Sequence, residues 1–162
     1  MRSMKAVVVG ALLAGLALAN AAGAAATAAG AEAAPSDPAV SAGRWRIVTV
    51  EMSGKPVEPE IVSMLSIIYG VDGSWTVFFK SLPVAEGTST VDQTTTPKTF
   101  EMHTLGSPSG NIPGRSYCGI YEMEGNRRRL CFVPAGRPRP AAFATARRTE
   151  QILVTLERVT SQ

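Results

Sequence analysis

Short runs of alternating apolar and polar residues, each closed by turn-forming residues, follow one another between residues 44 and 159. The first run, 44–52, is rich in strand-forming residues. Runs of the same kind predict further strands at 67–69, 74–80, 87–92, 99–104, 115–123, 127–133 and 151–159. About eight short strands with regular turns are typical of a β-sandwich or a β-barrel.

One short helix is expected after the first strand. Pro59 suits the first helical turn, and apolar residues recur at helical spacing from Ile61 to Ile68, which predicts a helix over 59–65. The strand pattern at 67–69 overlaps this helix, so helix and strand compete over 64–68. Asp72-Gly73 is then a strong signal for a β-hairpin.

Prolines and glycines predict where the strands stop. Pro83 is expected to end the strand that starts at Ser74, and 106–114 reads as a loop because it is rich in glycine, proline and serine. The three prolines of 134–140 are incompatible with a central strand. A short edge segment is expected at 141–146.

The N-terminus has the pattern of an export signal. Arg2 and Lys5 precede an uncharged apolar run, and Ala31-Glu32-Ala33 fits a cleavage site, which predicts a signal peptide at 1–33. A membrane anchor is the alternative, but the apolar run is short for a span. Residues 34–42 read as a flexible lead-in to one domain at 43–160, which we expect to be periplasmic or extracellular and free of the membrane after cleavage.

The charge is nearly balanced, with a formal net charge of +3 for the whole chain. That balance points to neither a nucleic-acid binder nor a membrane-surface protein. The distribution is uneven, because residues 115–162 hold nine arginines and only four acidic residues. These arginines form either a solvated rim or a patch for an anionic partner.

The sequence Arg137-Pro138-Arg139-Pro140 is the most prominent part of that basic region. It is either a stiff solvated connection or an interaction loop in which Arg137 and Arg139 meet an anionic envelope polymer or an acidic protein. The run 127–129, three consecutive arginines, adds to such a patch if it lies nearby.

Cys118 and Cys131 are the only cysteines, and they flank a turn near Gly125. With Glu124-Gly125 as the two-residue turn, Cys118 faces Cys131 and a disulfide is expected, as export permits. With Gly125-Asn126 as the turn, the two residues are offset. The alternative to a disulfide is a pair of small buried apolar side chains.

A Gly-x-Trp opens the first strand, at Gly43 and Trp45, and Arg158 lies in the last. This combination is typical of lipocalin-like barrels. In a barrel the first strand closes on the last, so Trp45 is expected to plug the narrow end while Arg158 stacks on its indole and donates to carbonyl groups at the closure. We interpret all three as residues of the fold rather than of a ligand site.

The chain resembles the small secreted lipocalin-like domain that is abundant in planctomycete bacteria. Motifs in family order cover about 43–159, and they lie at 43–51, 54–57, 97–99, 119–126, 130–132, 139–143 and 156–158. The resemblance implies an eight-stranded, mostly antiparallel, calycin-type barrel with no established activity. Cys118 and Arg128 depart from the pattern, and Arg128 replaces an expected apolar residue on the inward face of its strand.

The candidate chemistry is sparse. His103 is the only histidine, no Cys/His/carboxylate spacing suggests a metal, and phosphate-loop, dinucleotide and nucleophile-elbow motifs are missing from the sequence. We therefore expect no cofactor and no enzymatic activity. Five aromatic residues are expected inside the barrel, where they form either a filled core or the wall of a ligand pocket: Trp75, Phe79, Tyr117, Tyr121 and Phe132.

Two functions follow from these patterns. The first is an exported, monomeric, non-enzymatic binding module that holds a small hydrophobic molecule in its barrel. The alternative is an interaction or inhibitor module with a filled core, which acts through its Arg/Pro-rich loops. The first rests mainly on analogy of fold, and one fold supports many functions.

Overall fold

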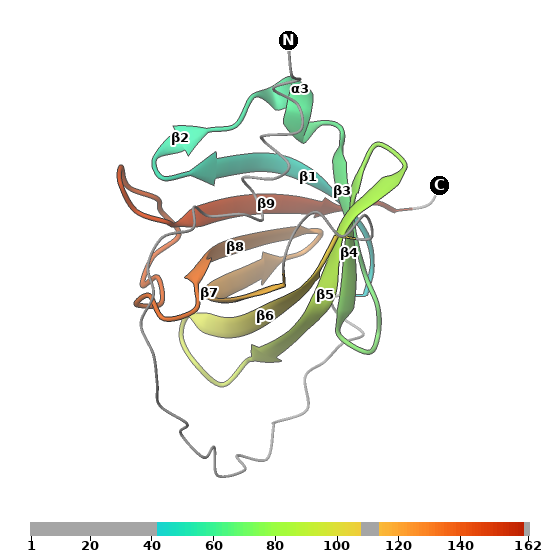
Figure 1. Cartoon of the computed structure of the whole chain (residues 1–162). Coiled ribbons are helices and arrows are strands. Elements are labelled where there is room, and N and C mark those ends of the chain that lie inside the picture. Colours follow the sequence, from blue (N-terminus) through green and yellow to red (C-terminus); the bar gives the residue numbers. More distant parts are fainter. Residues whose placement is uncertain (1–41, 108–113, 161–162) are drawn as a thin grey trace.

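Eight strands form a closed antiparallel barrel, in which the first strand pairs with the last (Figure 1). The structure is a computed structural model that describes residues 42–107 and 114–160. Each barrel strand pairs with the next, and β9 returns to β1. The barrel strands are β1 (Gly43–Met52), β3 (Leu65–Tyr69), β4 (Ser74–Phe79), β5 (Leu82–Asp92), β6 (Lys98–Gly106), β7 (Arg115–Glu124), β8 (Arg127–Pro134) and β9 (Ile152–Arg158). The predicted all-β barrel with one short helix is confirmed.

The helix α3 (Pro59–Val62) is shorter than the sequence predicts. Of residues 64–68, for which helix and strand compete, 65–68 belong to the strand β3. Leu65, Ile67 and Tyr69 alternate as buried positions in β3, which pairs with β1 on one side and β4 on the other. Pairing on both sides satisfies the backbone of this segment, so tertiary context overrides the helical spacing. A two-residue strand, β2 (Lys55–Pro56), also pairs with the end of β1.

Two predicted boundaries are wrong. Pro83 does not end a strand but lies near the start of β5, opposite Phe78 and next to a register shift, a place where a ladder tolerates proline. The expected edge segment at 141–146 forms no strand. It belongs instead to the 135–151 segment, which connects β8 to β9.

The 135–151 segment lies on the outer face of the barrel. The Arg139 Nη1 donates to the carbonyl oxygens of Phe100, at 3.0 Å, and Gly119, at 2.8 Å, which ties one part of the segment to β6 and β7. Thr145 donates to the Glu51 carboxylate of β1, and its hydroxyl accepts from the Gly54 amide at 2.9 Å. Outward-facing residues of β7–β9 are buried there, namely Ile120, Cys131, Val133 and Thr155.

The barrel closes at one end through Trp45 and Arg158, as the sequence predicts. The two residues are paired across β1 and β9, Trp45 is 0% exposed, and the Arg158 guanidinium carbon lies 4.5 Å from the centre of the indole ring. Arg158 Nη1 also donates to the Ala42 carbonyl at 2.7 Å. Gly43 adopts a φ of 116°, and a β-carbon there would lie 3.4 Å from that guanidinium. All three residues therefore serve the closure.

Aromatic rings cover two glycines on the inward face of the sheet. Gly87 of β5 lies opposite Trp75 of β4, and a β-carbon on Gly87 would come within 2.5 Å of the indole. Gly119 of β7 lies opposite Phe100 of β6, whose ring leaves only 2.6 Å for a β-carbon. Each glycine therefore makes room for a large ring from the neighbouring strand.

Three predictions fall outside the described residues, namely the signal peptide at 1–33, residues 34–41 of the lead-in and residues 108–113 of the 106–114 loop. Within 42–107 and 114–160, no helix has both the length and the apolar character that a membrane crossing requires.

Replacing Arg158 with methionine tests the closure. Because Arg158→Met removes a buried stack on Trp45 and a charged hydrogen bond to Ala42, we expect it to lower the free energy of unfolding by about 2–4 kcal/mol. The matched control is Arg46→Met, which removes only a surface ion pair with Glu157 between the same two strands and is expected to change stability by less than about 1 kcal/mol. Urea titrations would measure both. Equal effects of the two changes would contradict this role for Arg158.

Candidate binding site in the barrel interior

Four aromatic rings from β6, β7 and β8 meet inside the barrel. The ring centres of Tyr117 and Phe132 lie 5.7 Å apart, those of Phe100 and Phe132 lie 6.0 Å apart, and those of Phe100 and Tyr121 lie 6.4 Å apart. All three pairs are edge-to-face, the arrangement that aromatic quadrupoles favour. The cluster is a fixed aromatic wall on one side of the interior.

The structure brings together most of the residues that the sequence assigns to the barrel lining. Trp75, Tyr117, Tyr121 and Phe132 belong to the buried core, and Phe79 is half-buried and packs against it. Sequence reasoning missed Phe100, which contacts two of the other rings. The signal was available, because Phe100, Met102 and Thr104 occupy alternate positions of one predicted strand.

Arg128 is a charged side chain in the interior and is only 2% exposed. Its guanidinium carbon lies 4.8 Å from the ring centre of Tyr69 and 5.1 Å from that of Tyr121, so the charge lies close to two aromatic rings. The atoms Nε and Nη1 have no hydrogen-bond acceptor among the described residues. The departure seen in the sequence at Arg128 is therefore a real inward-facing charge.

The two tyrosines stabilise this charge only in part. Burying an ion costs several kcal/mol, whereas a desolvated cation–π contact contributes about 2 kcal/mol. Two contacts offset much of the desolvation but leave the N–H groups without acceptors. Burial raises the pKa of Tyr69 and of Tyr121, and the nearby Arg128 charge opposes both shifts. Both hydroxyls are therefore neutral at physiological pH.

A second donor in the interior also lacks an acceptor. Trp75 Nε1 is buried and has no hydrogen-bond partner in the described part of the chain. Buried polar groups are nearly always hydrogen-bonded, and those that are not call for an explanation such as a bound molecule or water. The interior thus combines an aromatic wall with two donor groups that can meet an acceptor.

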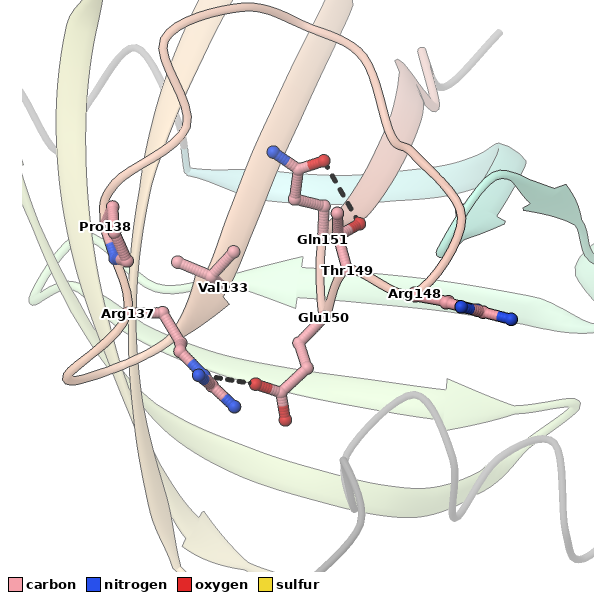
Figure 2. Close-up of a pocket in the computed structure, with 7 residues that line it drawn as sticks. All are labelled: Val133, Arg137, Pro138, Arg148, Thr149, Glu150 and Gln151. Atoms are coloured by element: carbon pink, nitrogen blue, oxygen red, sulfur yellow. Dashed lines mark hydrogen bonds and ion pairs between the residues drawn. The ribbon is translucent and has the colours of Figure 1, made fainter.

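The loop arginines of the alternative function are engaged within the molecule. Arg139 donates to two backbone carbonyls of the barrel and pairs with Glu101 at 3.1 Å. Arg137 pairs with Glu150 at 2.5 Å, and Figure 2 shows these two side chains pointing toward one another. They lie at a surface hollow of about 290 Å³, where Arg148 extends away from the pair (Figure 2).

The expected disulfide between Cys118 and Cys131 is not formed, and both cysteines are free. The turn is Gly125-Asn126, so Cys118 lies opposite Val133 and Cys131 lies opposite Ile120. This is the offset register, and diagonal neighbours on one face are generally too far apart for a disulfide. Each thiol donates instead to the 135–151 segment, Cys118 to the Arg137 carbonyl at 3.8 Å and Cys131 to that of Ala144 at 3.5 Å.

His103 lies on the exposed face of β6, where its Nδ1 is 2.8 Å from the Ser116 hydroxyl. In the ranges 42–107 and 114–160, no three histidine, cysteine, aspartate or glutamate side chains gather as metal ligands would. Comparison with protein-family models, with curated proteins and with solved structures gave no match. The resemblance to the planctomycete family therefore stays a prediction.

Substitution of Arg139 and of Arg137 tests which of the two anchors the 135–151 segment to the barrel. Arg139→Ala removes two charged hydrogen bonds to the barrel, so we expect the free energy of unfolding to fall by about 2–4 kcal/mol. Arg137→Ala, the matched control, breaks an exposed ion pair and is expected to cost less than about 1 kcal/mol. Urea unfolding of both variants would show the difference, and a larger loss for Arg137→Ala would contradict the anchoring role of Arg139.

Thiol accessibility tests the register of β7 and β8. Cys131 is fully buried and burial raises the pKa of its thiol, whereas Cys118 is half-buried. We therefore expect a disulfide-exchange reagent to modify Cys118 first in the native protein, and both thiols after unfolding without reductant. A mass two hydrogens lower than that of the dithiol chain, with no reactive thiol, would contradict the offset register.

Proposed function

We propose that this protein is an exported, non-enzymatic binding module of the lipocalin-like kind, which holds one small and mainly apolar molecule inside its barrel. An eight-stranded barrel is the size at which the interior is either filled by side chains or able to hold a single small ligand. The aromatic wall supports an apolar ligand, because such pockets are mostly lined by apolar and aromatic side chains with few polar groups.

One observation carries this proposal. Two buried donor groups in the interior, on Arg128 and Trp75, have no acceptor among the described residues. In a barrel built only as a solid core, apolar side chains at both positions would avoid this penalty. A ligand that brings an acceptor would satisfy the donors, so they favour a binding role.

The alternative, an interaction module that acts through its Arg/Pro-rich loop, has weaker support. Arg139 is used to fasten the 135–151 segment to β6 and β7, and Arg137 is neutralised by Glu150. Each guanidinium is already paired with a glutamate, so its attraction for an anionic polymer is reduced. Export and a monomeric state remain predictions from the sequence.

Native mass spectrometry of the exported protein tests the proposal. We expect a mass above that of the polypeptide under native conditions, and loss of the difference on denaturation, because the ligand is held without a covalent bond. Extraction with organic solvent followed by refolding should lower the melting temperature, and the extract should restore it by mass action. Identical native and denatured masses, with a melting temperature that extraction does not change, would count against an interior ligand.

A further inference from the structure

The two arginines inside the closed end of the barrel are in opposite states. Arg128 of β8 lies opposite Leu156 of β9, only two residues from Arg158. Arg158 stacks on Trp45 and donates to the Ala42 carbonyl. Arg128 stacks on Tyr69 and Tyr121, but two of its three nitrogens have no acceptor within the described residues. Arg158 thus contributes to the closure of the barrel, whereas Arg128 has N–H groups that can still donate to an acceptor.

No carboxylate of the described chain neutralises Arg128. The ion pairs of residues 42–107 and 114–160 join Arg46 to Glu157, Arg129 to Glu122, Arg137 to Glu150 and Arg139 to Glu101. The charge of Asp92 acts on Tyr121, but Asp92 is exposed and its carboxylate accepts from the amide and hydroxyl of Thr94. The positive charge at Arg128 is therefore both buried and uncompensated.

We propose that Arg128 is the binding site for the carboxylate of a small apolar organic acid. The proposal rests on the proposed function and adds the chemical class of the ligand. A guanidinium is planar and matches a carboxylate, and such charge-assisted hydrogen bonds are among the strongest in proteins. The apolar body of the acid would lie against the aromatic wall formed by Phe100, Tyr117, Tyr121 and Phe132.

The surroundings of Arg128 favour a carboxylate over a larger anion. The rings of Tyr69 and Tyr121 lie 4.8 Å and 5.1 Å from the guanidinium carbon, and the N–H groups that lack an acceptor, on Nε and Nη1, lie in the guanidinium plane. A flat, singly charged group that binds in that plane balances the one uncompensated charge. A phosphate monoester carries up to two charges and a tetrahedral group that extends out of the plane.

Binding of decanoate, compared with that of 1-decanol, tests this site. The two compounds share an alkyl chain and differ in the charged end, and titration with fluorescence of the buried Trp45 and Trp75 would report their affinities. We expect the protein to bind decanoate at least about tenfold more tightly than 1-decanol, since a charged hydrogen bond in a buried site is worth that much. Arg128→Met should abolish this preference by weakening decanoate alone.

Arg127→Met is the matched control, because Arg127 precedes Arg128 in β8 and is exposed. It should leave both affinities unchanged. The same titrations with Arg128→Gln decide the question if Arg128→Met does not fold. The ligand-free Arg128→Met protein should unfold at an equal or higher urea concentration than the unmodified protein, because it loses an uncompensated buried charge.

The outcomes separate this inference from the proposed function. If neither decanoate nor 1-decanol binds, and extraction of the exported protein changes nothing, both proposals fail. If the protein binds both compounds equally, or if Arg128→Met and Arg128→Gln keep the preference for decanoate, the interior site stands but the carboxylate site is overturned. A lower urea midpoint for ligand-free Arg128→Met would mean that Arg128 serves the fold.

Discussion

The pairing of β1 with β9 is the constraint on which the rest of the structure depends. Without it the eight strands are an open sheet whose two edges carry unpaired backbone groups. With it, the inward faces of all eight strands enclose a common interior in which Trp45, Trp75 and Tyr117 are almost fully buried. The stack of Arg158 on Trp45 fixes this pairing at one end, because each side chain belongs to one of the two joined strands.

Because the barrel is closed, the charge of Arg128 is buried rather than exposed to solvent. In water the N–H groups of Arg128 would be solvated, but in the barrel Nε and Nη1 are buried without an acceptor among the described residues. Elsewhere in the interior, size complementarity is close, as at Gly87 beneath Trp75 and Gly119 beneath Phe100. An uncompensated buried guanidinium lowers stability locally, and proteins accept such losses at functional sites.

Most of the fold could be predicted from the sequence, because it depends on alternation and turns. The strands, the Asp72-Gly73 hairpin and the closure by Trp45 and Arg158 followed from local patterns and one topological rule. The register about Gly125 could not be settled, because two adjacent turns fit the same residues and only pairing along β7 and β8 selects one. Pro83 was misjudged because its strand tolerates a proline near its start.

The candidate site was only partly predictable, for a different reason. Aromatic side chains on alternate positions indicate which residues face inward, so four of the five predicted lining residues are in the core. Whether a buried polar group has a partner depends on three-dimensional neighbours from several strands. Arg128 could be recognised as unusual within its strand, but Tyr69 comes from β3, which no sequence pattern connects to it, and the place of Tyr121 depends on the register of β7 and β8.

The closing contact also has a bearing on when the protein can fold. Arg46 and Glu157, which lie side by side in the β1–β9 ladder, are 111 residues apart in the chain. Pairing of such distant segments comes with a large loss of chain entropy and is intrinsically slow. A nascent chain that has not yet been synthesised as far as β9 therefore lacks this partner for β1. The barrel can therefore be completed only once β1 and β9 are both present, and until then β1 keeps an unpaired edge.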